Sequence, residues 1–390
     1  MSAEIVTLGC RMNLSESEAL GAMLAGSDNL VVINSCAVTS EAVRQTRQAI
    51  RRARRARPDA RLLVTGCAAE VEREALSAMP EVDGLIANAA KLDPRAWNVA
   101  RAPLAAHACH TRAFVAVQNG CDHACTFCVI PQGRGASRSQ AVATVLADIA
   151  RNLDAGVREV VLTGVDLTSW GTDLPGAPRL GALVAAILDA FPGLSRLRLS
   201  SLDGIEIDAL LFELIAGEAR LMPHVHLSLQ SGDDLVLKRM KRRHTRQDAI
   251  SLVQRLRARR PDIAIGADLI AGFPTESEHA HTANLSLIGE LDVVHGHIFA
   301  YSPRPGTPAA RMPQVRTETI RHRAAELRAA VKHQRAAWLT SLIGRALAVL
   351  AERDGTGHAP NFARVQLPAG TQAGSLVSVT PARLVEGMLA

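Results

Sequence analysis

The segment CDHACTFC (Cys121–Cys128) places three of the chain's seven cysteines within eight residues. Three residues separate the first pair, and two residues separate the second pair. A loop with this spacing can surround one cubic iron–sulfur cluster with three thiolates. Because a cube contains four irons, one iron is left without a protein ligand and can bind a reactant. The segment therefore predicts a catalytic cluster.

A zinc site is the alternative for the same loop. Structural zinc takes four ligands, often from paired C-x₂-C units, and His123 would be the fourth ligand here. Tetrahedral closure within so short a loop is awkward. The loop also follows a predicted strand at the start of a long α/β run, which favours the cluster over a zinc finger.

The residues from the loop onward alternate strand and helix patterns. Helical stretches such as Val142–Gly156 and Ala249–Arg260 separate six predicted strands. These strands are Ala113–Cys121, Arg158–Leu167, Arg196–Leu202, His224–Gly232, Ala264–Pro274 and Val294–Ser302. Six such units predict a curved, partly open parallel barrel, with polar motifs at the carboxyl ends of its strands, where barrel active sites lie.

A smaller, doubly wound α/β domain is predicted before the loop. Three of its strands, Glu4–Cys10, Leu30–Cys36 and Arg61–Cys67, end in cysteine at spacings of 26 and 31 residues. Each spacing matches one strand–helix unit. Since the carboxyl ends of parallel strands meet at one edge of a sheet, we predict that Cys10, Cys36 and Cys67 share a metal site. The alternative is three buried structural cysteines, because free cysteine is often buried.

The remaining elements complete three predicted domains. The first helix, Leu14–Leu24, has Ser15 as its expected cap and Glu18 at the capping-box position. A linker is predicted at Ala100–Ala108. After a helix near Arg321–His333, alternating apolar and polar residues predict a small β-barrel. The expected domain ranges are 1–103, 108–335 and 345–390.

Composition and charge bear on the partner and the compartment. The formal net charge is +6, and basic residues concentrate in Glu41–Arg57 and Lys238–Arg246. Such runs favour a polyanionic partner, and the alternative is a solvated helix face. No apolar stretch approaches the roughly 18 residues that span a bilayer, and the N-terminus lacks a secretory signal pattern. We therefore expect a cytoplasmic protein without membrane association, in which clustered cysteines act as metal ligands.

The cysteine loop resembles the signature of radical S-adenosylmethionine (SAM) enzymes. The resemblance implies that the open iron chelates the methionine part of SAM and that an electron from the cube yields a 5′-deoxyadenosyl radical. Phe127 matches the aromatic position that lies near the adenine. Other candidate SAM contacts are Asp166, Ser201, Gln230 and Gly272 at strand ends, with Arg198 or Arg239 for the SAM carboxylate.

The whole chain resembles the methylthiotransferase family. The motifs that support this are TLGCRMN, NSCAVT, VTGC, CDHACTFCVIPQGRGASRS, SLQSGDD, KRMKRRH, DLIAGFPTE and FAYSPRPGTPAARMP. Several of them look like the branch that acts on N6-threonylcarbamoyladenosine in tRNA. The resemblance implies two 4Fe–4S clusters, the second held by Cys10, Cys36 and Cys67 and donating sulfur. It also implies a C-terminal RNA-binding barrel of the TRAM type.

The implied reaction is methylthiolation at C2 of N6-threonylcarbamoyladenosine-37, with one SAM supplying the methyl group and another the radical. The implied partners are the tRNA anticodon loop and an electron donor such as flavodoxin or ferredoxin, and a monomer is expected. The sulfur source is left open, and Cys109 is expected to be a bystander. The alternative substrates are isopentenyladenosine in tRNA and an aspartate of a ribosomal protein. The non-enzymatic alternative is an iron–sulfur protein for electron transfer or RNA binding.

Overall fold

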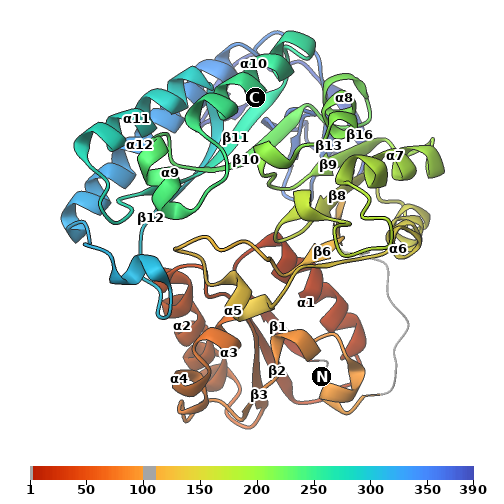
Figure 1. The fold of residues 1–390 in the computed structure, drawn as a ribbon. Helices are drawn as coiled ribbons and strands as arrows, with labels where there is room; N and C mark the ends of the chain where they lie inside the picture. The colour runs from red at the N-terminus through yellow and green to blue at the C-terminus, as the bar shows by residue number, and fades with distance from the viewer. Residues whose placement is uncertain (1–2, 100–110) are drawn as a thin grey trace.

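The chain folds into three units that follow one another in sequence (Figure 1). The structure is a computed structural model and describes residues 3–99 and 111–390. The predicted linker and Cys109 lie outside these residues. A parallel N-terminal sheet, a central parallel barrel and a strand-rich C-terminal unit confirm the predicted fold class. No helix in the described part of the chain is long and apolar enough to cross a membrane.

The N-terminal unit is a four-stranded parallel sheet in the order β1-β2-β3-β4. Its strands are β1 (Glu4–Thr7), β2 (Leu30–Ser35), β3 (Arg61–Gly66) and β4 (Gly84–Leu85). Its helices are α1 (Arg11–Met23), α2 (Ser40–Ala56), α3 (Cys67–Val71) and α4 (Arg73–Ser77), followed by the 3₁₀ turns η1 (Asn88–Ala90) and η2 (Pro94–Trp97). The first three strands are shorter than predicted, so Cys10 and Cys36 lie just beyond their strands and Cys67 begins α3.

Helices cover both faces of this sheet, as Figure 1 shows for α1 and α2. Leu20 of α1 belongs to the apolar cluster that contains Val32, whereas Ile50 of α2 belongs to the cluster that contains Ile33. Successive residues of a strand point to opposite faces, and β2 is buried along its whole length. Burial on both faces therefore explains its continuous apolar run.

The first helix begins earlier than the sequence predicts. Cys10 occupies the N-cap position without a side-chain cap, and Ser15 lies inside the helix. The predicted cap was wrong because the turn after β1 leads directly into α1. The Ser15 hydroxyl instead donates a hydrogen bond to the backbone carbonyl of Phe114 in the barrel, at 2.9 Å. This residue therefore joins two domains.

The central unit contains the six predicted strands as two parallel three-stranded sheets. They are β5 (Arg112–Ala116), β8 (Glu159–Thr163), β9 (Arg196–Leu199), β10 (His224–Gln230), β11 (Ala264–Ala271) and β12 (Val293–Ala300). Bridges between Leu197 and Leu221 and between Leu202 and Leu227 join the two sheets into a partly open barrel. A hairpin of β6 (Gln118–Asn119) and β7 (Arg138–Ser139) brackets the cysteine loop.

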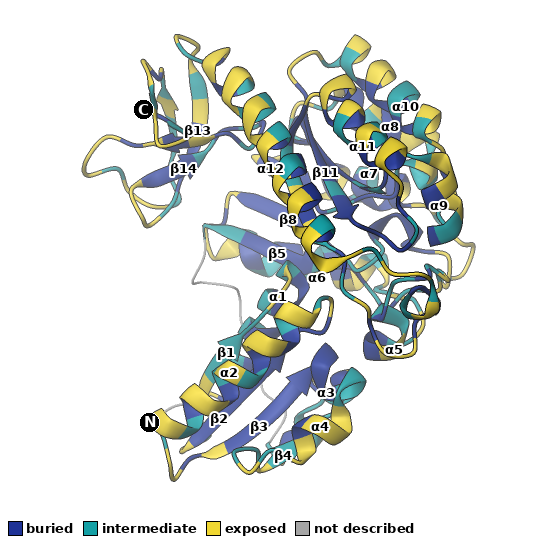
Figure 2. Cartoon of the chain, turned by 90° about the vertical axis from the view of Figure 1, so that its left-hand side faces the viewer, coloured by how far each residue is buried: buried dark blue, intermediate teal, exposed yellow. Residues whose placement is uncertain are grey.

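Helices surround the outside of the barrel, whereas the short helix α5 (Ile130–Arg134) lies against the N-terminal unit (Figure 1). The surrounding helices are α6 (Val142–Asp154), α7 (Leu180–Ala190), α8 (Ala209–Gly217), α9 (Asp234–Met240), α10 (Arg246–Arg259), α11 (Glu278–Glu290) and α12 (Thr317–Thr340). The connections contain the 3₁₀ turns η3 (Leu167–Ser169), η4 (Gly204–Glu206) and η5 (Pro308–Arg311). Figure 2 shows that the strands are buried and the outer faces of these helices are exposed.

The two faces of the barrel strands differ in polarity. On β11, Ile265, Ala267 and Leu269 belong to the apolar core shared with the helices. The alternate residue Asp268 faces the interior, where its Oδ1 lies 2.9 Å from His226 Nε2. The interior wall also carries Arg112, Glu159, Arg196, Arg198, His224, His295 and His297. The barrel therefore encloses a polar lumen within an apolar shell.

The N-terminal unit bridges the open side of the barrel, between β5 and β12. It contacts β5 through the bond from Ser15 to Phe114. It contacts the segment after β12 twice, because the Ser40 backbone amide donates to Ser302 Oγ at 3.2 Å and Arg304 pairs with Glu72 at 3.0 Å.

The C-terminal unit is a six-stranded sheet in the order β16-β13-β14-β15-β18-β17. Its strands are β13 (Leu347–Ala351), β14 (Thr356–His358), β15 (Arg364–Gln366), β16 (Leu376–Val379), β17 (Leu384–Val385) and β18 (Met388–Leu389). Val349, Val365 and Leu389 pack with Leu339 of α12 in one apolar cluster. Figure 2 shows this unit beyond the far end of α12.

This sheet closes the amino-terminal mouth of the barrel. Phe362 adopts a φ of 69° and lies against Arg198, with 4.8 Å from the guanidinium carbon to the ring centre. Arg198 also donates to the Pro360 carbonyl at 3.1 Å, and Arg196 donates to the Ala348 carbonyl at 2.6 Å. The two arginines share the carboxylate of Glu159, which is fully buried.

We expect Glu159→Gln to lower the free energy of unfolding by about 3–5 kcal/mol, because it leaves two buried guanidiniums without a counter-ion. The midpoint of urea unfolding measures this. The matched control is Glu213→Gln, which breaks an exposed pair with Arg259 and should cost at most about 1 kcal/mol. Equal midpoints for the two variants would contradict the expectation.

Candidate metal centre and cofactor site

The structure brings Cys10, Cys36 and Cys67 to one edge of the N-terminal sheet. Ser35 pairs with Gly66 in the register of β2 and β3, so the next residues on both strands are the cysteines. On the other side of β2, a Cβ added at Gly9 would lie 2.7 Å from Cys36 Sγ. The three cysteines therefore follow adjacent strand ends, as the sequence predicts.

Two glycines make this approach possible. Gly9 has a φ of 94° and Gly66 has a φ of 90°, a region that side chains strongly disfavour. A Cβ at Gly66 would also lie 2.4 Å from the backbone oxygen of Ser35. A side chain at either position would therefore push a cysteine away from its neighbouring strand.

Burial favours the protonated thiols of Cys36 and Cys67. Burial raises the pKa of the Cys36 thiol to about 11, and the nearby Cys10 and Cys67 raise it further. Burial also raises the pKa of Cys67, against the opposing effect of Arg134 and Lys91. A metal that binds thiolates would displace these protons.

A network of buried charged side chains lies beside the cysteine group of the N-terminal sheet. Glu16 accepts from Arg134 at 2.8 Å and lies 2.5 Å from the Lys91 ammonium, and all three side chains are almost fully buried. Asn13 accepts a further bond from Arg134 at 2.6 Å. Although burial opposes its charge, Cys67 and Glu16 hold the pKa of Arg134 above its usual range. The network thus supplies positive charge to sulfur ligands.

The same network links the two cysteine groups. Arg134 ends α5, the short helix that begins two residues after Cys128. A Cβ added at Gly133 would lie 3.2 Å from Cys67 Cβ, and the Gly133 carbonyl accepts a bond from the Asn88 amide at 2.5 Å. The loop of the barrel and the edge of the N-terminal sheet therefore meet directly at α5.

Backbone contacts fix the loop Cys121–Cys128. The amides of His123 and Ile130 each point to a sulfur at 3.4 Å, those of Cys121 and Cys128 respectively. Thr126 is bonded to the backbone of α9, with its hydroxyl donating to the Arg239 carbonyl at 2.8 Å. The two amides therefore shape the ends of the loop, and Thr126 holds its middle against α9.

The zinc alternative for the loop has one geometric counterpart in the described residues. The ligand atoms of Cys121, His123 and Asp166 lie within 4.8 Å of one another, close enough to hold a single ion. Cys125 and Cys128 do not belong to this group, so the prediction of a cluster depends on the spacing of the three cysteines.

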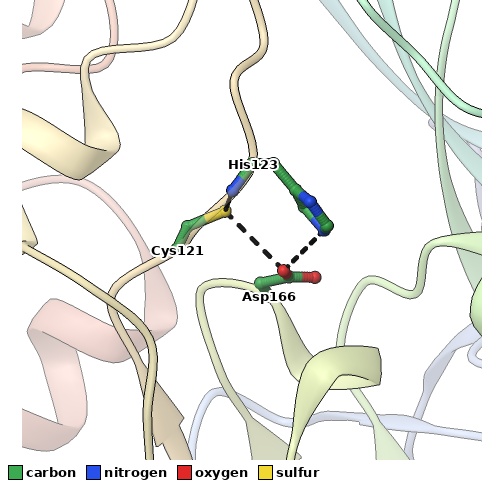
Figure 3. A group of neighbouring side chains, drawn as sticks. All are labelled: Cys121, His123 and Asp166. Atoms are coloured by element: carbon green, nitrogen blue, oxygen red, sulfur yellow. Dashed lines mark hydrogen bonds and ion pairs between the residues drawn. The ribbon is translucent and has the colours of Figure 1, made fainter. Parts of the chain in front are cut away.

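Asp166 lies beside the first cysteine of the loop (Figure 3). Its Oδ2 is 3.6 Å from Cys121 Sγ and 2.8 Å from His123 Nε2. It also accepts a bond from the Ser169 hydroxyl at 2.7 Å. Hydrogen bonds to Asp166 and Glu206 raise the pKa of His123 to about 10. Burial, with a smaller effect of Asp166, raises the pKa of Cys121 to about 12.

Arg242 lies beside the second cysteine, and the sequence did not single it out. Its Nη1 is 3.7 Å from Cys125 Sγ, while its Nη2 donates to Asp203 at 3.0 Å and to the Ser228 carbonyl at 2.8 Å. Its neighbour Arg243 pairs with Glu206 at 2.7 Å. Two sequence features could have pointed to Arg242. One is Asp203 just beyond β9, and the other is the adjacent pair Arg242 and Arg243 after α9.

Several arginines of both basic runs form ion pairs within the protein. In the first run, Arg47 pairs with Glu72 and Arg54 with Asp83. In the second run, Arg242 is mostly buried at the cysteine loop. The prediction that these runs face a polyanion applies only to their exposed remainder.

The predicted SAM contacts lie in several places. Asp166, Ser201 and Gln230 follow or end β8, β9 and β10, so they share the carboxyl edge of the barrel with the cysteine loop. Phe127 lies edge-on to Phe273, with 6.4 Å between ring centres.

The other three predicted contacts have partners of their own. Gly272 approaches Ile320 of α12, where a Cβ would lie at 2.5 Å. Arg239 donates to Thr275 at 2.7 Å. Arg198 is not brought to this edge, because it pairs with Glu159 towards the opposite mouth.

Two family models match the chain. Residues 115–286 match the radical SAM superfamily, and residues 2–87 match an uncharacterized protein family, UPF0004. The first match covers the end of β5, the cysteine loop and the four barrel strands β8 to β11. Fold and site together define a radical SAM enzyme.

The chain also resembles characterised proteins over most of its length. It is 43% identical to the threonylcarbamoyladenosine tRNA methylthiotransferase MtaB of Rickettsia prowazekii, over 99% of this chain and 96% of that protein. It is 35% identical to the tRNA-2-methylthio-N(6)-dimethylallyladenosine synthase of Cereibacter sphaeroides, over 90% of this chain and 87% of that protein. The chain therefore belongs to the radical SAM tRNA methylthiotransferase family. The predicted enzyme class and the predicted cofactors, SAM and two 4Fe–4S clusters, are confirmed at the level of this family.

Solved structures share the fold. The radical SAM methyltransferase TsrM of Kitasatospora setae, with cobalamin and a [4Fe–4S] cluster bound, matches with a TM-score of 0.54 at 17% identity, over 72% of this chain and 65% of that chain. The cobalamin-dependent enzyme OxsB matches with a TM-score of 0.52 at 10% identity, over 84% of this chain and 56% of that chain. This chain spans less than two thirds of either protein, and at these identities the likeness concerns the fold alone.

We expect Arg242→Gln to make the reduction potential of the loop cluster more negative and to slow 5′-deoxyadenosine formation. The reason is that a positive charge near a ligand sulfur stabilises the reduced cluster. A redox titration followed by electron paramagnetic resonance measures the potential. Lys241→Gln, which removes an adjacent exposed cation, is the control. An unchanged potential at full iron content would contradict the role of Arg242.

Proposed function

We propose that this enzyme adds a methylthio group to C2 of the adenine in N6-threonylcarbamoyladenosine-37 of tRNA. The observation that carries the proposal is the meeting of the two cysteine groups at α5. Gly133, five residues after Cys128, lies against Cys67. A reaction that needs a radical at one cluster and sulfur at the other requires that both lie near one substrate carbon.

The cysteine roles in this proposal follow from their positions. Cys121, Cys125 and Cys128 would hold the cluster that binds SAM, and Cys10, Cys36 and Cys67 would hold the cluster that provides sulfur. When bound, the first cluster supplies the electron that generates the radical from SAM.

The surrounding residues would neutralise the charge of the thiolates and orient SAM. Arg134 and Lys91 place positive charge next to the N-terminal thiolates, which favours their deprotonated form. Arg242 does the same near Cys125. Asp166, whose carboxylate lies at the loop, is positioned for a cationic group such as the SAM ammonium, although His123 and Ser169 occupy it in this structure.

The choice of substrate rests on likeness along the chain. Identity to the threonylcarbamoyladenosine enzyme is 43%, against 35% for the dimethylallyladenosine enzyme. The segments CVIPQGRGASRS, LTGVDLTSWG and SLQSGDDLVLKRMKRRHTR support the same choice. The strand-rich C-terminal unit, whose sequence resembles an RNA-binding TRAM barrel, supports tRNA as the partner. A cytoplasmic location, a monomeric state and a flavodoxin or ferredoxin donor remain predictions.

Replacing Cys10, Cys36 and Cys67 by alanine is expected to leave roughly half of the iron, because one of two four-iron clusters is lost. This variant should still form 5′-deoxyadenosine from SAM but should not transfer a methylthio group. Alanines at Cys121, Cys125 and Cys128 should abolish both activities. Iron is measured after anaerobic reconstitution. The formation of 5′-deoxyadenosine is measured with dithionite as the reductant.

Cys109→Ala is the matched control and should retain full iron. The sulfur-donor role fails if the first triple variant loses one cluster but keeps full methylthio transfer. The radical role fails if the reconstituted wild-type protein forms no 5′-deoxyadenosine.

Deletion of the gene is expected to remove 2-methylthio-N6-threonylcarbamoyladenosine from tRNA and to accumulate its precursor without the methylthio group. The methylthio derivative of isopentenyladenosine should be unchanged. Mass spectrometry of tRNA nucleosides measures all three species. Loss of the isopentenyl derivative instead would assign the alternative substrate. Persistence of the threonylcarbamoyl derivative, in a strain with no second such enzyme, would overturn the proposal.

A further inference from the structure

Arg11 differs from the other arginines that surround the floor of the barrel lumen. It is the first residue of α1 and directly follows Cys10. Its guanidinium carbon lies 5.8 Å from the ring centre of Phe114 and 5.6 Å from that of Phe362. Among the described residues it has no hydrogen-bond or ion-pair partner. The side chain is half-buried between two aromatic rings with its donors unused.

The neighbouring charges already have partners. Arg112 pairs with Glu352 at 2.6 Å. Arg196 and Arg198 share Glu159. Among these four arginines, Arg11 is the one whose guanidinium has no carboxylate partner in the described residues.

Asp268 is the other carboxylate near Arg11, and it is also occupied. Its Oδ1 lies 2.9 Å from His226 Nε2 and 3.0 Å from His297 Nδ1. These contacts hold the pKa of Asp268 well below its usual range despite burial. Arg11 therefore lies between two aromatic rings with no carboxylate of its own among the described residues, and an added anion would satisfy its donors.

The lumen is open to a ligand at this level. On the interior face of β12, the His297 side chain is 60% exposed and Phe299 is 36% exposed. An exposed aromatic ring on a barrel wall can stack a base, and an exposed histidine beside Asp268 can accept or donate a hydrogen bond.

We propose that Arg11 binds the carboxylate of the threonylcarbamoyl substituent and so selects this modified adenosine. This inference rests on the proposed function, because it assigns the receptor for a group that only that substrate has. A guanidinium can bind a carboxylate through two parallel hydrogen bonds. The threonylcarbamoyl group carries one carboxylate, which matches the one unpaired guanidinium in the lumen.

The uncharged alternative fits this site poorly. An isopentenyl group is apolar and has no acceptor, so its entry would bury Arg11 further without a partner. Selection would therefore work in both directions, through a bond to the correct substituent and a desolvation penalty for the wrong one. Because Arg11 follows Cys10, the receptor is also joined covalently to a proposed ligand of the sulfur-donating cluster.

The test measures binding of anticodon stem-loop RNAs to the full-length reconstituted protein. One RNA carries N6-threonylcarbamoyladenosine and the other carries its methyl ester, which lacks the negative charge. The wild-type protein should bind the free acid about 10- to 100-fold more tightly than the ester, the range expected for a charge-assisted bond. Arg11→Gln should abolish most of this preference, and Arg11→Lys should keep part of it. The methyl ester should bind both variants nearly as well as it binds the wild-type protein.

Arg259→Gln, which removes an exposed cation of α10, is the matched control and should keep the full preference. Iron content and 5′-deoxyadenosine formation from SAM check that Arg11→Gln folds and holds its clusters. Equal preference for the acid in Arg11→Gln and the wild-type protein would overturn the role of Arg11. Failure of the proposed function is distinguishable, because then the wild-type protein itself would neither prefer nor methylthiolate the free acid.

Discussion

The buried side chain of Arg134 is the interaction on which the arrangement of this protein depends. It belongs to the barrel domain in sequence, but its hydrogen bonds go to Glu16 and Asn13 of the N-terminal domain. A charge buried in this way is stable only with its partners in place, because an unpaired buried guanidinium would cost several kcal/mol. The two domains are therefore fixed relative to each other at the point where their cysteines meet. Together with the hydrogen bond from Asn88 to Gly133, this bond holds the two cysteine groups near each other.

The charged residues in the barrel lumen also depend on partners from another unit of the chain. Parallel barrels commonly fill their interior with apolar layers, whereas this one contains arginines, histidines and two acidic side chains. The C-terminal sheet makes this possible by offering backbone carbonyls to Arg196 and Arg198. At the floor, the ring of Phe362 lies against Arg112, Arg198 and His224. The C-terminal unit thus completes the barrel, in addition to any role in binding RNA.

Local patterns in the sequence predicted the parts of the fold that depend on local physics. The cysteine spacing of the loop, the six strand–helix units and the three cysteine strand ends follow from periodicity and topology alone. The alternating histidines in HVH and HGH carry the same kind of signal, since period two places them on one face of β10 and β12. They indicate a polar barrel interior.

The missed features depend on partners that are distant in sequence. Arg242 and the exposed arginines of α2 have the same side chain. Composition alone therefore cannot show that Arg242 lies beside a cysteine and that the others lie on the surface. The pairing of Arg198 with Glu159 arises from neighbouring strands and moves the arginine away from the predicted cofactor edge. Ser15 matched a helix cap, but the domain contact with Phe114 decides its role. Single-residue patterns contain no information about such contacts.

Closure of the barrel floor by Phe362 has a consequence for the order of events. The N-terminal unit covers the side between β5 and β12, so the described chain leaves the carboxyl edge as the entrance to the lumen. Ligands that reach the lumen through one edge of the barrel bind one after another. A tRNA bound across this edge would cover any SAM that lies below it, so SAM would have to bind before the tRNA and its products would leave after the tRNA.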